Sequence, residues 1–154
     1  MATFSKIGKD GAGTAYFAVK YEPGCLNALP WGHEKFDCLI FKQGNDDLMK
    51  HATDELLTKN CDWIHTAGED PRYWHDYIDQ RSVNLGRQAA VGDGNPMTAW
   101  HDDMVNPEKW ESTINFGGSN YFLILLVGFT DINGVLEALT GKLTEHSIGG
   151  AGGE

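Results

Sequence analysis

Two stretches of this chain contain almost no polar side chains, and they limit its fold more than any other feature. The runs "YFLILLVGF" (121–129) and "FDCLIF" (36–41) are too short to cross a bilayer and too apolar to expose either face. Strands in which polar and apolar residues do not alternate are typical of parallel sheets that are covered on both faces. The two runs therefore predict central strands of a mostly parallel sheet.

Strand and helix patterns alternate along the rest of the chain. Further strands are expected over 14–24, 61–68 and 97–101, and helices over 45–60, 69–86, 106–118 and 131–143. The expected fold is a single three-layer α/β sandwich with a sheet of about five strands, mainly parallel. We expect one domain over 13–145, between a flexible N-terminus (1–12) and a flexible Gly-rich tail (146–154).

Composition and charge narrow the classes of function. With 154 residues, 41% of them hydrophobic and 22% charged, the chain suits one globular domain rather than a disordered segment. The formal net charge of −10 disfavours contact with nucleic acid phosphates or an anionic membrane, and it permits a basic protein partner or a bound cation. An odd number of cysteines (Cys25, Cys38 and Cys61) and the lack of an apolar signal core predict reduced thiols in a cytoplasmic protein.

Several catalytic and nucleotide-binding signatures are missing from the sequence. No Gly-x-Gly-x-x-Gly segment joins a strand to a helix, and neither a Walker phosphate loop nor a Gly-x-Ser-x-Gly elbow occurs. The Gly-rich segment 91–96 has no basic residue to serve a phosphate. Nucleotide-driven chemistry is therefore disfavoured, the sequence requires no cofactor, and the balance leans away from an enzyme.

The tripeptide Trp-His-Asp occurs twice, at 74–76 and at 100–102. The first copy lies in a helical pattern, where His75 and Asp79 are one turn apart on the flank of the helix. A pair of this kind is usually solvated, so we interpret it as a surface pair. The second copy lies at the end of a strand, and the repeat is therefore not a structural duplication.

The strand copy is the better candidate for a site, because ligands of open α/β sheets bind outside the carboxyl ends of the strands. His101, Asp102 and Asp103 follow one predicted strand, and His65 lies near the end of another. Imidazole with carboxylate suits general acid-base chemistry or a divalent metal, so these four residues are the candidate catalytic set. Their spacing matches no established metal motif, and the metal stays undetermined. Helix capping explains three other acids at this edge, Asp46, Asp70 and Asp131, and Asn45 is the alternative cap to Asp46.

Aromatic side chains are abundant for a chain of this length. Five tryptophans and five tyrosines are present, and the tryptophans cannot all be fully buried in a domain this small. Tryptophans surrounded by acidic residues make good anchors for a basic partner. The candidate binding surface comprises Trp31, Trp74, Trp100 and Trp110. The alternative is that the tryptophans cover the faces of the sheet beneath short helices.

The order of "LPWGHEKFDCLIF", "CDWIHTAGEDPRYWHDYID" and "MTAWHDD" resembles a small bacterial family of unknown function. In that family a Phe-Asp-Cys-Leu-Ile strand precedes a helix, a strand that begins with Cys and a Trp-Asp helix. A Thr-x-Trp-His-acid segment comes later. The resemblance spans Leu29 to Asp103 and implies a compact bacterial or phage-encoded α/β protein. It carries no known activity, so it assigns no catalytic residue.

Two hypotheses about function follow from these patterns. The first is a non-enzymatic binding protein, immunity- or inhibitor-like, whose acidic, Trp-containing surface engages a basic protein partner. The second is a small hydrolase-like or ligand-binding enzyme with a His/Asp site at the carboxyl edge of the sheet. The sequence also permits self-association, and it leaves open whether the Gly-rich C-terminus is processed or conjugated.

Overall fold

The computed structural model describes residues 3–85, 96–111 and 119–152, with only the backbone described over 144–152. The strands are β1 (Ser5–Lys9), β2 (Ala15–Lys20), β3 (Phe36–Lys42), β4 (Cys61–Gly68), β5 (Met97–Trp100) and β6 (Tyr121–Val127). The helices are α1 (Asp46–Leu56), α2 (Pro71–Leu85) and α4 (Asn133–Gly152), with short 3-10 helices η1 (Cys25–Ala28) and η2 (Pro107–Lys109). No helix in the described part of the chain is long and apolar enough to cross a membrane.

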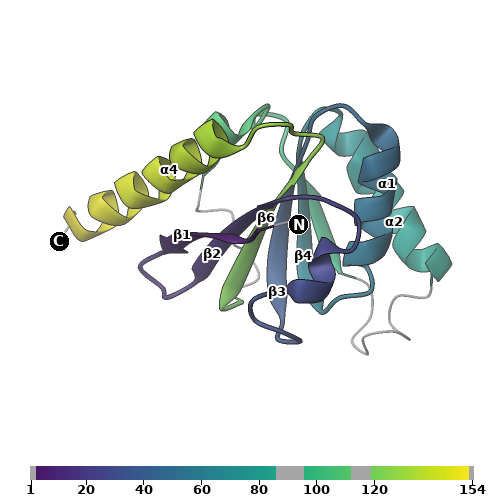
Figure 1. The fold of residues 1–154 in the computed structure, drawn as a ribbon, viewed down its shortest axis with the longest axis horizontal. Helices are drawn as coiled ribbons and strands as arrows, with labels where there is room; N and C mark the ends of the chain where they lie inside the picture. Colours follow the sequence, from purple (N-terminus) through teal and green to yellow (C-terminus); the bar gives the residue numbers. More distant parts are fainter. Residues whose placement is uncertain (1–2, 86–95, 112–118, 153–154) are drawn as a thin grey trace.

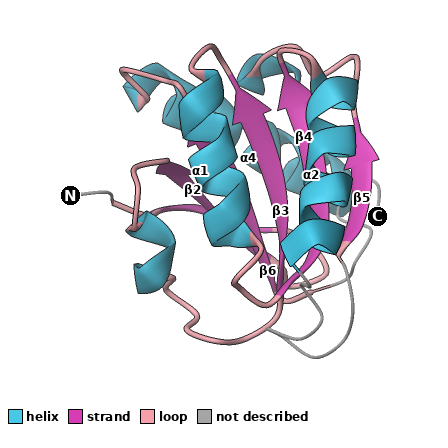
Figure 2. Ribbon diagram, turned by 90° about the vertical axis from the view of Figure 1, so that its right-hand side faces the viewer, coloured by secondary structure: helices cyan, strands magenta, loops and turns pink. Residues whose placement is uncertain are grey.

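The strands form one sheet in the order β1-β2-β6-β3-β4-β5, parallel throughout except for β1, which pairs antiparallel with β2. Helices α1 and α2 cover one face of this sheet, and α4 lies over the other (Figure 1). Figure 2 shows the strands from the side of α1 and α2, with the carboxyl ends of β3, β4 and β5 at the top. The predicted α/β fold with a mostly parallel sheet is confirmed, although the sheet has six strands rather than five.

The central strands are apolar because both of their faces are covered. Every residue of β3 is buried, and so is every residue of β6 except the first. Side chains alternate between the faces, so Cys38 and Ile40 pack beneath α1 and α2 while Leu39 and Phe41 pack beneath α4. The two apolar runs thus build the cores of both layers.

The sixth strand is β1, which lies in the segment predicted to be a loose N-terminus. Its sequence, SKIGK, has one large apolar residue, Ile7, and that side chain is buried beneath α4. An edge strand of this kind is held mainly by backbone hydrogen bonds, and these leave little trace in the hydrophobic pattern. The predicted domain start at residue 13 is therefore too late.

The predicted helices agree with the structure near the start of the domain and differ near its end. Of the helix expected over 106–118, the structure has the three-residue η2, and residues 112–118 lie outside the described part. Helix α4 continues to Gly152, beyond the predicted domain end at 145. That residues 146–154 are flexible stays a prediction, since a helical backbone does not measure mobility. The connection expected over 89–96 lies outside the described residues except for Pro96.

One carboxylate holds the long connection between β2 and β3 against α1. Glu55 of α1 accepts hydrogen bonds from the Tyr21 hydroxyl (2.6 Å), the Gly24 amide (2.9 Å) and the Leu26 amide (2.8 Å). A carboxylate that accepts three hydrogen bonds from one loop fixes the path of that loop. Leu26 is thereby held in the core beneath α1.

We expect Glu55→Ala to lower the free energy of unfolding by about 1–3 kcal/mol, because it leaves the Tyr21 hydroxyl and two amides without their acceptor. Urea unfolding at pH 7 measures the change. Glu34→Ala is the matched control, since Glu34 is exposed in the same connection. Equal unfolding midpoints for the two variants would show that the Glu55 contacts contribute nothing.

Candidate functional site

Two of the four predicted site residues meet on the sheet face that carries α4. His65 is fully buried in β4, and His101 follows the end of β5. The His65 Nδ1 and the His101 Nε2 share a hydrogen bond of 2.9 Å. The His101 amide donates to the Thr66 carbonyl (3.0 Å), which holds the second histidine beside the first. The Trp63 ring stacks on His65, with 5.7 Å between ring centroids.

Burial keeps this histidine pair neutral. Desolvation, assisted by the neighbouring His101, lowers the pKa of His65 to about 3. Burial also lowers the pKa of His101, although the charges of Asp103 and Glu111 partly oppose that shift. A neutral pair places one proton between the two nitrogens, and only the half-buried His101 can exchange protons with a ligand.

The two aspartates of the predicted set do not join the histidines. Asp102 lies 3.7 Å from the Arg72 guanidinium, and both side chains are about two-thirds exposed. Asp103 is exposed and acts on His101 through its charge. Among the residues that the structure describes, no three His, Cys, Asp or Glu side chains are arranged to hold a metal ion.

Carboxylates elsewhere at the carboxyl edge have structural partners. The buried Lys42 ammonium bonds to Asp46 (2.6 Å) and Glu69 (3.3 Å), so both acids neutralise a lysine at the end of β3. Asn45 rather than Asp46 caps α1, since its side chain accepts from the Leu48 amide. Of the two residues predicted as possible caps of this helix, Asn45 and Asp46, the first is therefore the cap.

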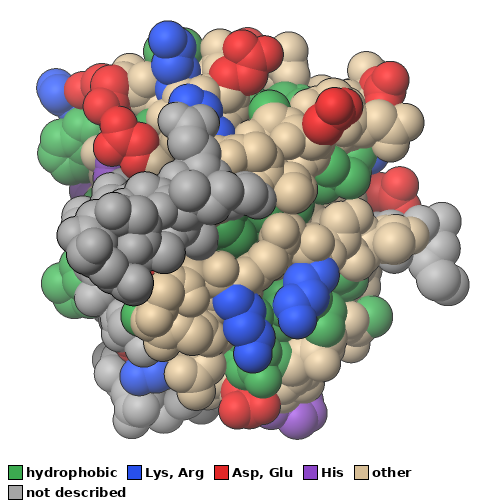
Figure 3. Space-filling model, turned by 90° about the vertical axis from the view of Figure 1, so that its left-hand side faces the viewer, with side chains coloured by type: hydrophobic (Ala, Val, Ile, Leu, Met, Phe, Trp, Pro, Cys, Tyr) green, Lys and Arg blue, Asp and Glu red, His purple; other side chains and the backbone are tan. Residues whose placement is uncertain are grey.

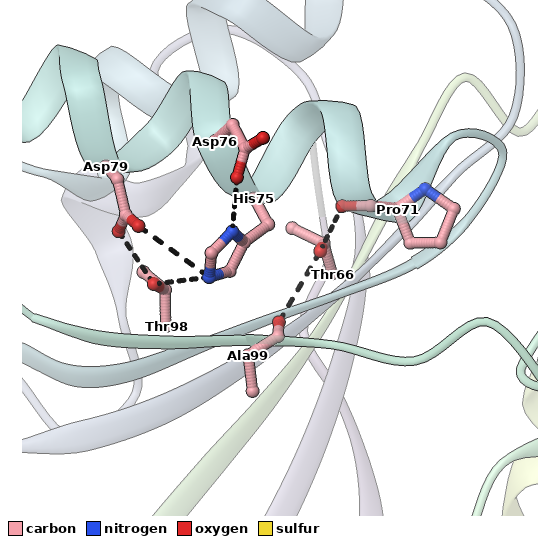
Figure 4. Close-up of polar contacts among 7 residues, drawn as sticks. All are labelled: Thr66, Pro71, His75, Asp76, Asp79, Thr98 and Ala99. Atoms are coloured by element: carbon pink, nitrogen blue, oxygen red, sulfur yellow. Dashed lines mark hydrogen bonds and ion pairs between the residues drawn. The ribbon is translucent and has the colours of Figure 1, made fainter.

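The first Trp-His-Asp copy is more enclosed than a solvated surface pair. The His75 side chain is 13% exposed and points from α2 toward β5 (Figure 4). Its Nδ1 lies 2.9 Å from the Asp76 carboxylate and its Nε2 lies 3.0 Å from the Thr98 hydroxyl. The same hydroxyl donates to Asp79 at 2.6 Å. Next to this network, Thr66 of β4 donates to the Pro71 carbonyl (2.7 Å) at the start of α2.

Counting protons shows how these hydrogen bonds fit together. Ionised carboxylates only accept, so Thr98 gives its proton to Asp79 and can only accept from His75. The two ring nitrogens of His75 thus face the Thr98 hydroxyl and the Asp76 carboxylate. Thr98 is thus not arranged as a nucleophile activated by His75, because its proton is directed at Asp79.

The two tripeptide copies meet at the flank of α2. The Trp100 ring packs edge-on against His75, with centroids 4.7 Å apart, and the Arg72 guanidinium carbon lies 5.1 Å from the Trp100 ring centroid. We call this contiguous set the α2–β5 surface. Its members are Arg72, His75, Asp76, Asp79, Thr98, Trp100 and Asp102.

Only one of the four tryptophans predicted to form a binding surface is exposed. Trp100 is 40% exposed, whereas Trp31, Trp74 and Trp110 are 6%, 2% and 1% exposed. Trp31 stacks on Tyr121 at 5.2 Å, and the other two lie in the cores on opposite faces of the sheet. The prediction is wrong for these three, because they cover the sheet, as the alternative interpretation proposed.

Asp37 is a fully buried carboxylate in β3 and was not among the predicted site residues. Its Oδ2 accepts a long hydrogen bond from the Ser119 amide (3.4 Å), and its Oδ1 has no hydrogen-bond partner among the residues that the structure describes. Burial raises the pKa of Asp37 to about 6. A lone acid within the run "FDCLIF" was the available signal, because a strand covered on both faces has to bury it.

Comparison of the chain with protein-family models and with curated proteins finds no match. The resemblance drawn from the sequence motifs therefore gains no support, and the site rests on its geometry alone.

Asp37→Asn should stabilise the protein at neutral pH. The folded-state pKa is raised from 3.8 to about 6, so the unfolded chain ionises first, and stability from the neutral acid, present below pH 4, is lost as pH rises through 6. The shift corresponds to roughly 3 kcal/mol, an upper estimate. Urea unfolding of both proteins at pH 7 and pH 4 tests this. A gain that is equal at both pH values, or larger at pH 4, would contradict it.

Proposed function

We propose that this protein is a non-enzymatic, cytoplasmic binding protein, immunity- or inhibitor-like and of bacterial or phage origin, that engages a basic protein partner through the α2–β5 surface. The observation that carries the proposal is the placement of exposed apolar side chains. In the described part of the chain, the large hydrophobic side chains that stand out as exposed are Trp100, which belongs to the α2–β5 surface, and five others on the same two elements or in the segment after β5: Tyr73, Val83, Leu85, Met97 and Val105.

Clustering of this kind favours an interface over chance exposure. Single exposed hydrophobic residues are ordinary on any protein, whereas several on adjoining elements are typical of interaction sites. Strand β5 pairs with β4, and within the described residues no strand pairs with its other side. The exposed residues thus lie along an edge of the sheet and on the helix beside it.

Charge supports a basic partner. The α2–β5 surface carries three aspartates and one arginine, with Asp103 adjoining it, on a chain of net charge −10. Asp76 and Asp102 are 72% and 66% exposed. Such a surface attracts a positively charged partner and speeds its association at low salt.

Arg72 illustrates how a partner cation could bind. Its guanidinium stacks over Trp100 and lies near Asp102, so the face of an aromatic ring and a carboxylate both contact the same cation. An arginine or lysine of a partner would find the same chemistry around the exposed part of the indole ring. Trp100 is thus the expected anchor of the interface, because tryptophans are the residues most often found as binding hot spots.

Affinity capture with the immobilised protein from an extract of its native host, at low salt, should return a basic protein in stoichiometric amount. With the purified partner, Trp100→Ala should raise the Kd about tenfold or more, and Asp102→Asn combined with Asp103→Asn should slow association at low salt.

The matched control removes two exposed acids elsewhere, Glu34→Gln and Asp47→Asn, and should leave the Kd unchanged. Binding that survives Trp100→Ala, or that weakens equally in the control, would place the interface elsewhere. Failure to capture any stoichiometric partner would end the proposal.

The hydrogen-bonded pair of His65 and His101 favours a second candidate, a small hydrolase-like enzyme. His101 would act as general base and His65 as the positioning residue behind it. Wild-type protein should then hydrolyse p-nitrophenyl esters at pH 7, with His101→Gln losing about a hundredfold or more. No turnover above buffer, or equal turnover by the variant, would remove this candidate.

A further inference from the structure

After two neighbouring central strands, the chain continues to opposite faces of the sheet. Strands β3 and β6 are parallel and adjacent, yet β3 leads into α1 on one face and β6 into α4 on the other (Figure 1). A crevice opens at such a switch point in α/β sheets, outside the carboxyl ends of the strands. A cavity of about 550 Å³ lies here, within the range of small-molecule sites.

Backbone contacts hold the two loops that border this cavity. The Gln43 amide donates to the Val127 carbonyl (2.9 Å), which joins the end of β3 to the end of β6. Gly128 has φ +87°, and a Cβ there would lie 1.8 Å from the Gln43 carbonyl oxygen. Only glycine allows this approach, so the shape of the cavity is built into the fold.

The cavity has an apolar floor and a polar rim. Pro107 is buried, and Phe129, Val135 and Ala138 are partly buried, so together they offer carbon surface to a ligand. The exposed rim includes Gln43, Thr130 and two carboxylates, Glu108 and Asp131. A ligand with a compact apolar body and a polar end would match both parts.

The charges at the rim decide which polar end fits. One carboxylate oxygen of Asp131 accepts a hydrogen bond from the Asn133 amide (3.0 Å) in the first turn of α4. Within the described residues nothing hydrogen-bonds to the Glu108 carboxylate, and no cationic side chain lines the cavity. The nearby Lys20 ammonium is directed at the Thr130 carbonyl (3.2 Å). Figure 3 shows acidic and basic side chains mixed along the upper part of the molecule, seen from the side of α4.

We propose that this cavity is a binding site for a small organic cation, an amine on a compact apolar body. The ammonium would lie between Glu108 and Asp131, and the apolar body would pack on Phe129, Val135 and Ala138. The inference is independent of the α2–β5 surface, which involves other elements.

Two probes with the same aromatic ring and opposite charges test which ligand charge the cavity prefers. They are phenethylammonium and 3-phenylpropanoate, each titrated into ¹⁵N-labelled protein. The amine should shift the amide signals of Gln43, Thr130, Gly134 and Val135 with a Kd of about 1 mM or lower, and the carboxylate should not. Asp131→Asn and Glu108→Gln should each weaken binding about two- to fivefold, as expected for exposed ion pairs.

Ala138→Leu fills the floor and should abolish the shifts, while Glu34→Gln, which removes an exposed acid before the start of β3 at the opposite edge of the sheet, should leave the Kd unchanged. Tighter binding of the carboxylate, shifts spread over the acidic surface, or unchanged binding by Ala138→Leu would each overturn the proposal. The amide spectrum of each free variant reports whether its fold is retained.

Discussion

Burial of β3 and β6 on both faces is the constraint from which the other features follow. Two adjacent strands without a polar face have to be covered on both sides, so the chain sends α1 and α2 to one face and α4 to the other. That division opens the crevice between the ends of β3 and β6. It also leaves β5, four residues long, at the margin of the sheet, where Trp100 and Met97 remain exposed.

The same burial shifts the pKa values of two polar groups inside the sheet. Asp37 and His65 are both fully buried on the face beneath α4, and desolvation shifts their pKa values in opposite directions, each toward the uncharged form. His65 therefore stays uncharged at neutral pH, whereas Asp37, with a pKa of about 6, is mostly ionised at pH 7 at a cost in stability. Lys42 is also buried but stays charged, because Asp46 and Glu69 bond to its ammonium.

Different physical signals explain which parts of the structure were predictable. The apolar runs predicted β3 and β6, and the rule that ligands bind at carboxyl ends of strands brought His65 and His101 into one candidate set. Strand β1 was missed because backbone pairing leaves no apolar pattern in SKIGK. Aromatic content does not show which tryptophans are buried, so Trp31, Trp74 and Trp110 were wrongly predicted to be exposed. The contact between His75 and Trp100 depends on how α2 packs against β5, which local patterns do not encode.

We propose that the partner binds the α2–β5 surface. Amide hydrogen exchange of the free protein and of its complex with the captured partner tests this proposal. We expect added protection concentrated in residues 71–85 and 97–105, with β1 and β2 unchanged. Protection elsewhere, with no change in those two segments, would contradict it.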